Sequence, residues 1–235
     1  MHKINVEIWL TNFHKSSKDY FCINCNDLHK YLTQQLCQSL PGFHAFTGSD
    51  YTCSFYRKGK VKPFAILKKH PKYQKLFSDL NNPTCVENDE MMKILQEFTN
   101  TMYGLKNCTS VNNARFILFE KFFSSDSEGE LFMKNVKQFD SNIIPPCWKS
   151  LKEKILRTTY VTNMWQNATD PVCTKYKLQD CGWLVNSNEV EPLWFEGDPT
   201  PLNIEDIIFP EDREYTIEEE FSELHAVETE DYNSD

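Results

Sequence analysis

The chain has 235 residues with a formal net charge of −9, and 40% of its residues are apolar and 14% aromatic. This composition supports a packed core and excludes a chain that is disordered throughout. No apolar run is long enough to cross a bilayer, and the presence of only seven glycines argues against nucleotide-binding glycine loops. The nine cysteines, an odd number, and an N-terminus without a signal-peptide pattern predict reduced thiols. We therefore expect an intracellular protein, nuclear or cytoplasmic, with no membrane partner.

The negative charge is concentrated at the C-terminal end. Residues 203–235 carry thirteen acidic residues and one arginine, a net charge of −12, which leaves +3 for the rest of the chain. So acidic a segment cannot bury enough apolar surface to fold, and it is expected to be mostly disordered after Glu211. It is a candidate binding segment for a protein partner.

Two short strands are predicted near the N-terminus, at 6–10 and 20–23. They form either a hairpin or a pair of neighbouring strands. Asn26 and Asp27 then suit a helix start, and leucines at every fourth position from Leu28 to Leu40 mark one stripe of an amphipathic helix. Pro41-Gly42 is expected to break or offset that helix, before a short helical turn that carries two phenylalanines inward, Phe43 and Phe46.

A basic helix is predicted to open near Lys60 and to end or kink at Pro71. Later helices are expected at 87–103, 111–123 and 128–139, and a long one from Trp148 towards Asn167. A β-hairpin follows, and its expected inward residues are Trp183, Val185, Val190 and Trp194. The tryptophans fall at helical and strand spacings, which favours packing in a core over stacking on bases.

These elements predict a helix-rich α/β protein. We divide it into residues 1–80, a helical extension with the β-hairpin at 81–202, and the acidic tail at 203–235.

A lone carboxylate and a basic turn lie close together in the sequence. Asp50 sits on a Thr47-Gly48-Ser49-Asp50 loop, where it either coordinates Mg²⁺ or caps the next turn. From Arg57 to Lys75 the chain has eight Lys or Arg residues and no acidic one. A helix start of this kind can bind phosphate through backbone N–H groups, with lysines reaching neighbouring phosphates. The predicted nucleic-acid-binding residues are Arg57, Lys58, Gly59, Lys60, Lys62, Lys68 and Lys69. We expect Lys58, Lys60 and Lys62 to lie away from the apolar stripe of Phe64 and Leu67.

A second cluster of polar residues, near the N-terminus, raises the possibility of a zinc site. Cys22, Cys25 and His29 resemble half of such a site, but structural zinc needs four ligands in paired clusters. His44 and Cys53 could complete it only by coincidence, because the sequence has no second paired cluster. The pattern therefore does not favour zinc.

The segment from Thr47 to Tyr51, followed by Lys58-Gly59-Lys60 and a helix, resembles the flap-endonuclease and PIN-like nuclease superfamily. The resemblance implies that Asp50 matches a metal-binding aspartate and that the turn at Gly59 opens a helix that binds the duplex backbone. It is closer to uncharacterised, often transposon-associated animal proteins with a PIN-like domain, over most of residues 4–195. The shared segments are 44–50, 113–115, 156–165, 182–183 and 192–194.

The sequence departs from that family in ways that bear on activity. The family's first aspartate, an acidic cluster and an Asp-x-Asp strand precede the matching region, and this chain starts after them. Arg57 also replaces the first glycine of the turn. We therefore interpret the chain as a truncated, nuclease-derived fragment that binds nucleic acid, with DNA as the expected partner, and is catalytically inactive alone. The alternatives are a protein-interaction module and a Mg²⁺-dependent structure-specific endonuclease completed by a partner chain or a further exon, with Asp50 as its catalytic metal ligand.

Overall fold

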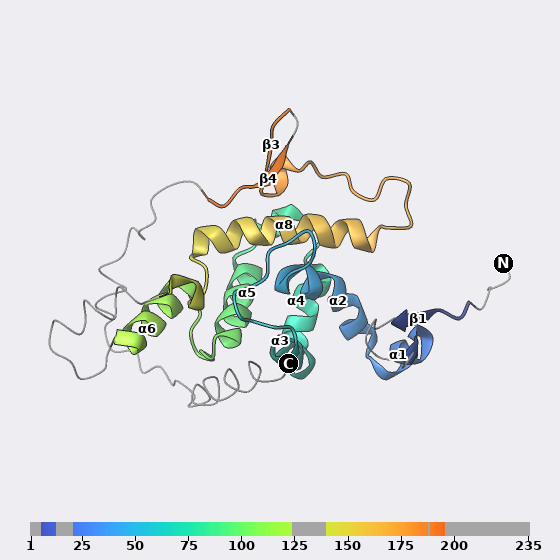
Figure 1. Ribbon diagram of the computed structural model, residues 1–235, viewed down its shortest axis with the longest axis horizontal. Coiled ribbons are helices and arrows are strands. Elements are labelled where there is room, and N and C mark those ends of the chain that lie inside the picture. The colour runs from blue at the N-terminus through green and yellow to red at the C-terminus, as the bar shows by residue number, and fades with distance from the viewer. Residues whose placement is uncertain (1–5, 13–20, 124–139, 188, 196–235) are drawn as a thin grey trace, which may run out of the picture.

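The computed structural model describes residues 6–12, 21–123, 140–187 and 189–195 (Figure 1). It is helix-rich and contains two small antiparallel β-hairpins. The helix predicted at 128–139 and the acidic tail lie outside the described residues. None of the described helices has the length and apolar character that a membrane crossing requires.

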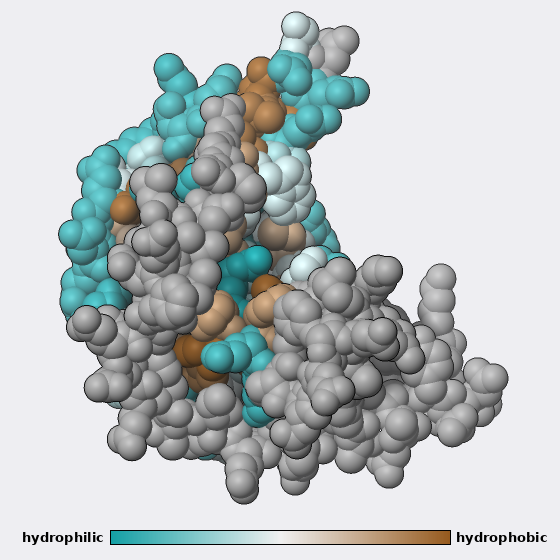
Figure 2. Space-filling view, turned by 90° about the vertical axis from the view of Figure 1, so that its left-hand side faces the viewer, coloured by the Kyte–Doolittle hydropathy of each residue, from teal (hydrophilic) through white to brown (hydrophobic). Residues whose placement is uncertain are grey.

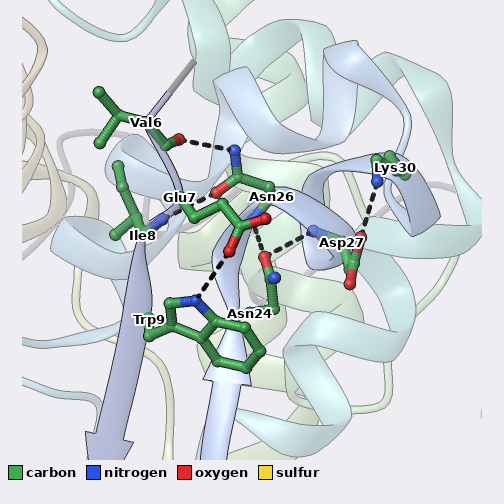
Figure 3. A network of polar contacts seen from close by, with 8 residues as sticks. All are labelled: Val6, Glu7, Ile8, Trp9, Asn24, Asn26, Asp27 and Lys30. Atoms are coloured by element: carbon green, nitrogen blue, oxygen red, sulfur yellow. Dashed lines mark hydrogen bonds and ion pairs between the residues drawn. The ribbon is translucent and has the colours of Figure 1, made fainter. Parts of the chain in front are cut away.

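The N-terminal unit consists of one strand pair and a short helix. Strand β1 (Trp9–Asn12) pairs antiparallel with β2 (Phe21–Asn24), as predicted, although β1 starts later than expected. Helix α1 (Cys25–Tyr31) follows directly, and the Asn24 side chain caps its first turn. Asn26 fixes the residues before β1, because its side chain donates to the carbonyl of Val6 and accepts from the amide of Ile8 (Figure 3).

The leucine stripe does not form one helix, so that prediction is wrong. The chain breaks between α1 and α2 (Gln34–Thr47), where Leu32 is extended and the Thr33 hydroxyl accepts a hydrogen bond from the amide of Leu36. A new helix start therefore replaces the continuous stripe. Leu36 is buried in the core, whereas Leu28 is 45% exposed.

Pro41-Gly42 does not break α2, which contradicts the predicted interruption. The helix runs through Pro41 and carries Phe43 and Phe46 into the core. Gly42 serves a packing role instead, since a Cβ atom there would lie 2.2 Å from the carbonyl oxygen of Phe77 in α4 (Pro71–Asp79). The glycine thus lets the backbones of α2 and α4 approach closely.

Aromatic side chains form the centre of the core. Phe77 and Phe98 make an edge-to-face pair with ring centroids 4.9 Å apart, and Phe43 and Phe46 pack against both. They come from α2, α4 and α5 (Asp89–Met102). The core cluster extends from Leu36 to Ile155, so it draws side chains from both sides of the boundary placed at residue 80.

The remaining helices surround this centre (Figure 1). Helix α3 (Val61–Lys69) ends just before Pro71, as predicted. Helix α6 (Val111–Phe123) has the predicted bounds, and α8 (Trp148–Gln166) lies across the others as the predicted long helix. Short 3-10 turns complete the connections: η1 (Pro83–Glu87), η2 (Ser141–Ile143) and η3 (Gln179–Cys181).

The second hairpin pairs β3 (Trp183–Val185) with β4 (Val190–Pro192) on the outer side of α8. Its apolar side chains were expected to point into the core, and that prediction is wrong for three of four. Val185, Val190 and Trp194 are 38%, 49% and 58% exposed, and Trp183 alone is half-buried. The sheet has only two strands, so it rests on α8 through its base and leaves its faces open.

Candidate functional site

Asp50 lies at the tip of a tight loop that follows α2. Gly48 starts the loop with a φ of 117°, where a Cβ atom would come within 2.7 Å of Ser54. Ser49 and Thr52 then close it with a β-bridge and a hydroxyl pair 2.8 Å apart, and Thr52 also donates to the carbonyl of Ala45. The loop is therefore closed by serine and threonine, and Asp50 is left exposed at its end.

The surroundings of Asp50 do not fit a two-metal hydrolytic centre. Such a centre needs several carboxylates within one site. The described residues contain no group of three His, Cys, Asp or Glu side chains that could hold a metal ion, for zinc or for Mg²⁺. Asp27 and Asp79, both near Asp50 in sequence, form ion pairs with Lys30 and Lys75.

Lys60 is bound at the C-terminal end of α2. Its ammonium donates to the carbonyls of His44 and Gly48, to the hydroxyl of Thr47 and to Nδ1 of His44. A cation at this position satisfies carbonyls left without partners at a helix end and complements the helix dipole. The phosphate contact predicted for Lys60 stays a prediction, and it would have to compete with these four hydrogen bonds.

His44 shares this environment. Partial burial lowers the pKa of the His44 imidazole, the nearby Lys60 lowers it further, and Asp50 acts in the opposite direction. The imidazole also stacks against Trp165, with ring centroids 5.5 Å apart. The His44 imidazole therefore contacts both Lys60 and Trp165 of α8.

Lys58 and Arg57 are also in contact with aromatic rings. The Lys58 ammonium lies 4.6 Å from the ring centroid of Tyr103, and burial lowers its pKa, with a smaller contribution from Lys62. Arg57 has a φ of 51° and lies over Tyr56 at 5.2 Å. Lys58 and Lys60 of the basic turn therefore contact packed parts of the protein, at Tyr103 and at the end of α2. A Cβ atom at Gly59 would meet nothing within 4 Å, so no close packing requires glycine there.

Three of the predicted lysines remain on an open surface. Lys62, Lys68 and Lys69 are all exposed, whereas Pro63 and Leu67 of the same helix are buried. With 3.6 residues per turn, positions 62 and 69 lie on one side of α3, and position 68 lies about 100° around the helix from position 69. We call these three residues the α3 lysine face. Helix α3 contains no acidic residue.

Two further cations, which the sequence analysis missed, lie on the buried side of α8. The Lys154 ammonium donates to the carbonyl of Cys53 and lies 3.7 Å from its Sγ and 4.6 Å from the ring centroid of Phe55. Burial lowers the Lys154 pKa to about 8, partly opposed by Cys53. Helical spacing could have found this residue, because position 154 shares a face with the fully buried Leu151 and Thr158.

Arg157 joins α8 to the β3–β4 hairpin. Its Nη1 donates to the carbonyls of Gly182 and Leu193, and its guanidinium lies over the indoles of Trp183 and Trp194 at 5.9 and 5.6 Å. Burial lowers the Arg157 pKa, and Cys53 and Glu153 oppose that shift. The hairpin is therefore held at its base by one buried cation.

The loop and the hairpin enclose an open pocket of about 390 Å³. Residues 49–53 line one side, and Arg157, Trp183, Pro192 and Trp194 line the other. The structure thus places Asp50 beside aromatic residues that are more than 130 positions later in the sequence. The zinc candidates stay apart from this pocket, with the exception of Cys53.

Comparisons with models of protein families, with curated proteins and with solved structures find no match for this chain.

Proposed function

We propose that the chain is a nucleic-acid-binding protein derived from a PIN-like or flap-endonuclease-like nuclease, and that it does not hydrolyse its ligand alone. The observation that carries this proposal is the α3 lysine face, where Lys62, Lys68 and Lys69 are exposed on a helix without acidic residues. Lysines arranged in this way attract phosphate and displace its counterions.

Neighbouring cations support this assignment by contrast. Lys72 and Lys75 of α4 form ion pairs with Glu97 and Asp79, with N–O distances of 2.6 and 2.9 Å. Their charge is balanced locally, and that of the lysine face is not balanced by any residue of α3. The nucleic-acid backbone would therefore follow α3 rather than α4.

The resemblance to the nuclease superfamily also supports a binding role for this region. Gly48, Asp50 and Gly59 match the family positions that hold metal and open the duplex-binding helix. A single carboxylate gives too little negative charge to hold two metal ions beside a phosphate. The proposal therefore keeps the binding role of this region and assigns no hydrolysis to Asp50.

Binding to duplex DNA, followed by fluorescence anisotropy over a range of salt, tests the proposal. Replacing Lys62, Lys68 and Lys69 by Ala should weaken binding to all sequences and reduce the salt slope, by roughly 0.9 for each lost phosphate contact. The matched control replaces three exposed lysines elsewhere, Lys152, Lys175 and Lys177, with the same change in net charge. Equal losses in both variants, or an unchanged salt slope, would contradict a specific role for α3.

A second measurement addresses hydrolysis. We expect no cleavage of flap, hairpin or single-stranded DNA with Mg²⁺ or Mn²⁺, because the described residues contain no group of three His, Cys, Asp or Glu side chains that could hold a metal ion. Metal-dependent cleavage that disappears in Asp50→Asn would overturn this part of the proposal. It would favour the active nuclease alternative instead.

A further inference from the structure

The pocket between the Ser49–Cys53 loop and the β3–β4 hairpin has a rigid aromatic wall. Trp194 is 58% exposed, yet the backbone before it is fixed, because Arg157 donates to the Leu193 carbonyl and Leu193 donates to the Gly182 carbonyl at 3.0 Å. The Arg157 guanidinium lies over the ring, 5.6 Å from its centroid, and also lines the pocket. A large aromatic side chain held in this way offers a stacking surface at little cost in side-chain entropy.

The opposite wall is also open and aromatic. Tyr51 is 61% exposed at the tip of the loop, next to the exposed Asp50. Figure 2 shows apolar surface gathered over the protruding β3–β4 hairpin, where Leu184, Val185 and Val190 are exposed. The rim therefore combines apolar and aromatic groups with one carboxylate.

The charges define the ligand. The Asp50 carboxylate at the rim repels a phosphate group but accepts hydrogen bonds from N–H groups. Arg157 is buried, and its Nη1 is already bound to two carbonyls. The pocket thus suits a flat, uncharged ring that carries an amino donor.

We propose that this pocket binds one unpaired nucleobase of a single-stranded nucleic acid, stacked on Trp194, with Asp50 accepting from its amino group. The inference rests on the proposed function and extends it from the phosphate backbone to the bases. A base within a duplex presents its faces to its neighbours and its donors to its partner, so only an unpaired base can enter. Aspartate accepting from the cytosine N4 amino group is an established pairing.

The first experiment compares short oligo(dC) strands with duplex DNA by fluorescence anisotropy. Trp194→Ala should weaken single-strand binding by about 5-fold to 100-fold, the range that stacking of one base supplies, and leave duplex binding unchanged. The salt slope should stay the same, because Trp194 contacts no phosphate. Trp9→Ala is the matched control, since Trp9 is 53% exposed on the separate β1–β2 pair.

Base preference tests the role of Asp50. The parent should bind oligo(dC) more tightly than oligo(dT), which has no amino group, and Asp50→Asn should reduce that preference. The same binding measurements with oligo(rC) and oligo(rU) show whether the pocket prefers DNA or RNA. Single-strand affinity within 2-fold of the parent in Trp194→Ala, or an equal loss for duplex, would overturn the proposal.

A nucleoside measurement separates this inference from the proposed function. Saturation-transfer NMR with cytidine, which has no phosphate, should show contact in the parent and in Trp9→Ala but not in Trp194→Ala. If the variants of the α3 lysine face bind DNA like the parent while cytidine still contacts Trp194, the backbone site is wrong and the base site stands. No cytidine contact in the parent would overturn the base site.

Discussion

Two regions in the described part of the chain hold lysines with different surroundings. On the inner side, Lys60 and Lys154 donate to backbone carbonyls at the end of α2 and at Cys53, and none of these acceptors is a carboxylate. On the outer side, Lys62, Lys68 and Lys69 are exposed on α3. Lys60 and Lys62 are two positions apart, yet one is part of the scaffold and the other faces solvent. A run of lysines in a sequence therefore does not by itself define a binding surface.

The largest expected effect concerns the inner region and its response to pH. The folded-state pKa of Lys154 is lowered to about 8 from the ordinary value of 10.5, so its burial cost is fully present below pH 8. Between pH 8 and 10.5 the unfolded chain binds more protons at this residue than the folded one, and stability rises with pH. Relative to Lys154→Met, the parent should gain about 3 kcal/mol in free energy of unfolding over that window.

Urea denaturation of both proteins at several pH values measures this difference. Burial raises the pKa of the Cys85 and Cys181 thiols, which lowers stability at alkaline pH, but both thiols are present in each protein and cancel in the comparison. A difference between parent and variant that stays constant with pH would show that Lys154 is not buried as a cation.

The next effect compares the two regions directly. Lys60→Ala should lower the free energy of unfolding by about 2 kcal/mol, because the carbonyls of His44 and Gly48 lose their donor. Lys62→Ala, in the outer region, should change it by less than about 0.5 kcal/mol. Denaturation curves at neutral pH compare the two variants. Equal stability losses would remove the distinction between scaffold and surface lysines.

The smallest effect is at Gly59, between the two regions. A Cβ atom there has no neighbour within 4 Å and the residue has no positive φ, so Gly59→Ala should raise stability by about 0.5 kcal/mol through the unfolded state. Gly48→Ala is the contrast, with a φ of 117° and Ser54 at 2.7 Å, and should be destabilising. Gly59→Ala should also retain the DNA affinity of the parent. A large loss of affinity would show that phosphate approaches the backbone at Gly59 rather than the lysine face.

Much of the local structure could be predicted because it depends on neighbouring residues. Pro71 ends α3 since proline cannot continue the helix, and the apolar spacing in α5, α6 and α8 set their positions and type. The strand pair β1–β2 and the β3–β4 hairpin were also placed correctly within a few residues. The exposed α3 lysine face follows from the same helical spacing.

The features that failed depend on contacts between distant segments. Gly42 lies inside α2, where the backbone of α4 packs against it. No pattern in the neighbouring sequence predicts that the Phe77 carbonyl lies next to Gly42. The β3–β4 side chains were assigned inward from alternation, but a two-stranded sheet attached through Arg157 has no second layer to cover them. The candidate base pocket is likewise a tertiary feature, since Asp50 and Trp194 are far apart in the sequence but line the same pocket.

Local sequence was enough to place α3, α5, α6, α8, the two strand pairs and the basic stretch, because propensity, capping and periodicity act over a few residues. Tertiary packing decided which backbone carbonyls Lys60 and Lys154 bind. Lys60 and Lys154 lie where helix ends and loops leave carbonyls without partners, and a long flexible ammonium side chain satisfies them. Hydrogen-bond satisfaction of a buried backbone is a property of the packed chain, so it cannot be derived from the order of lysines.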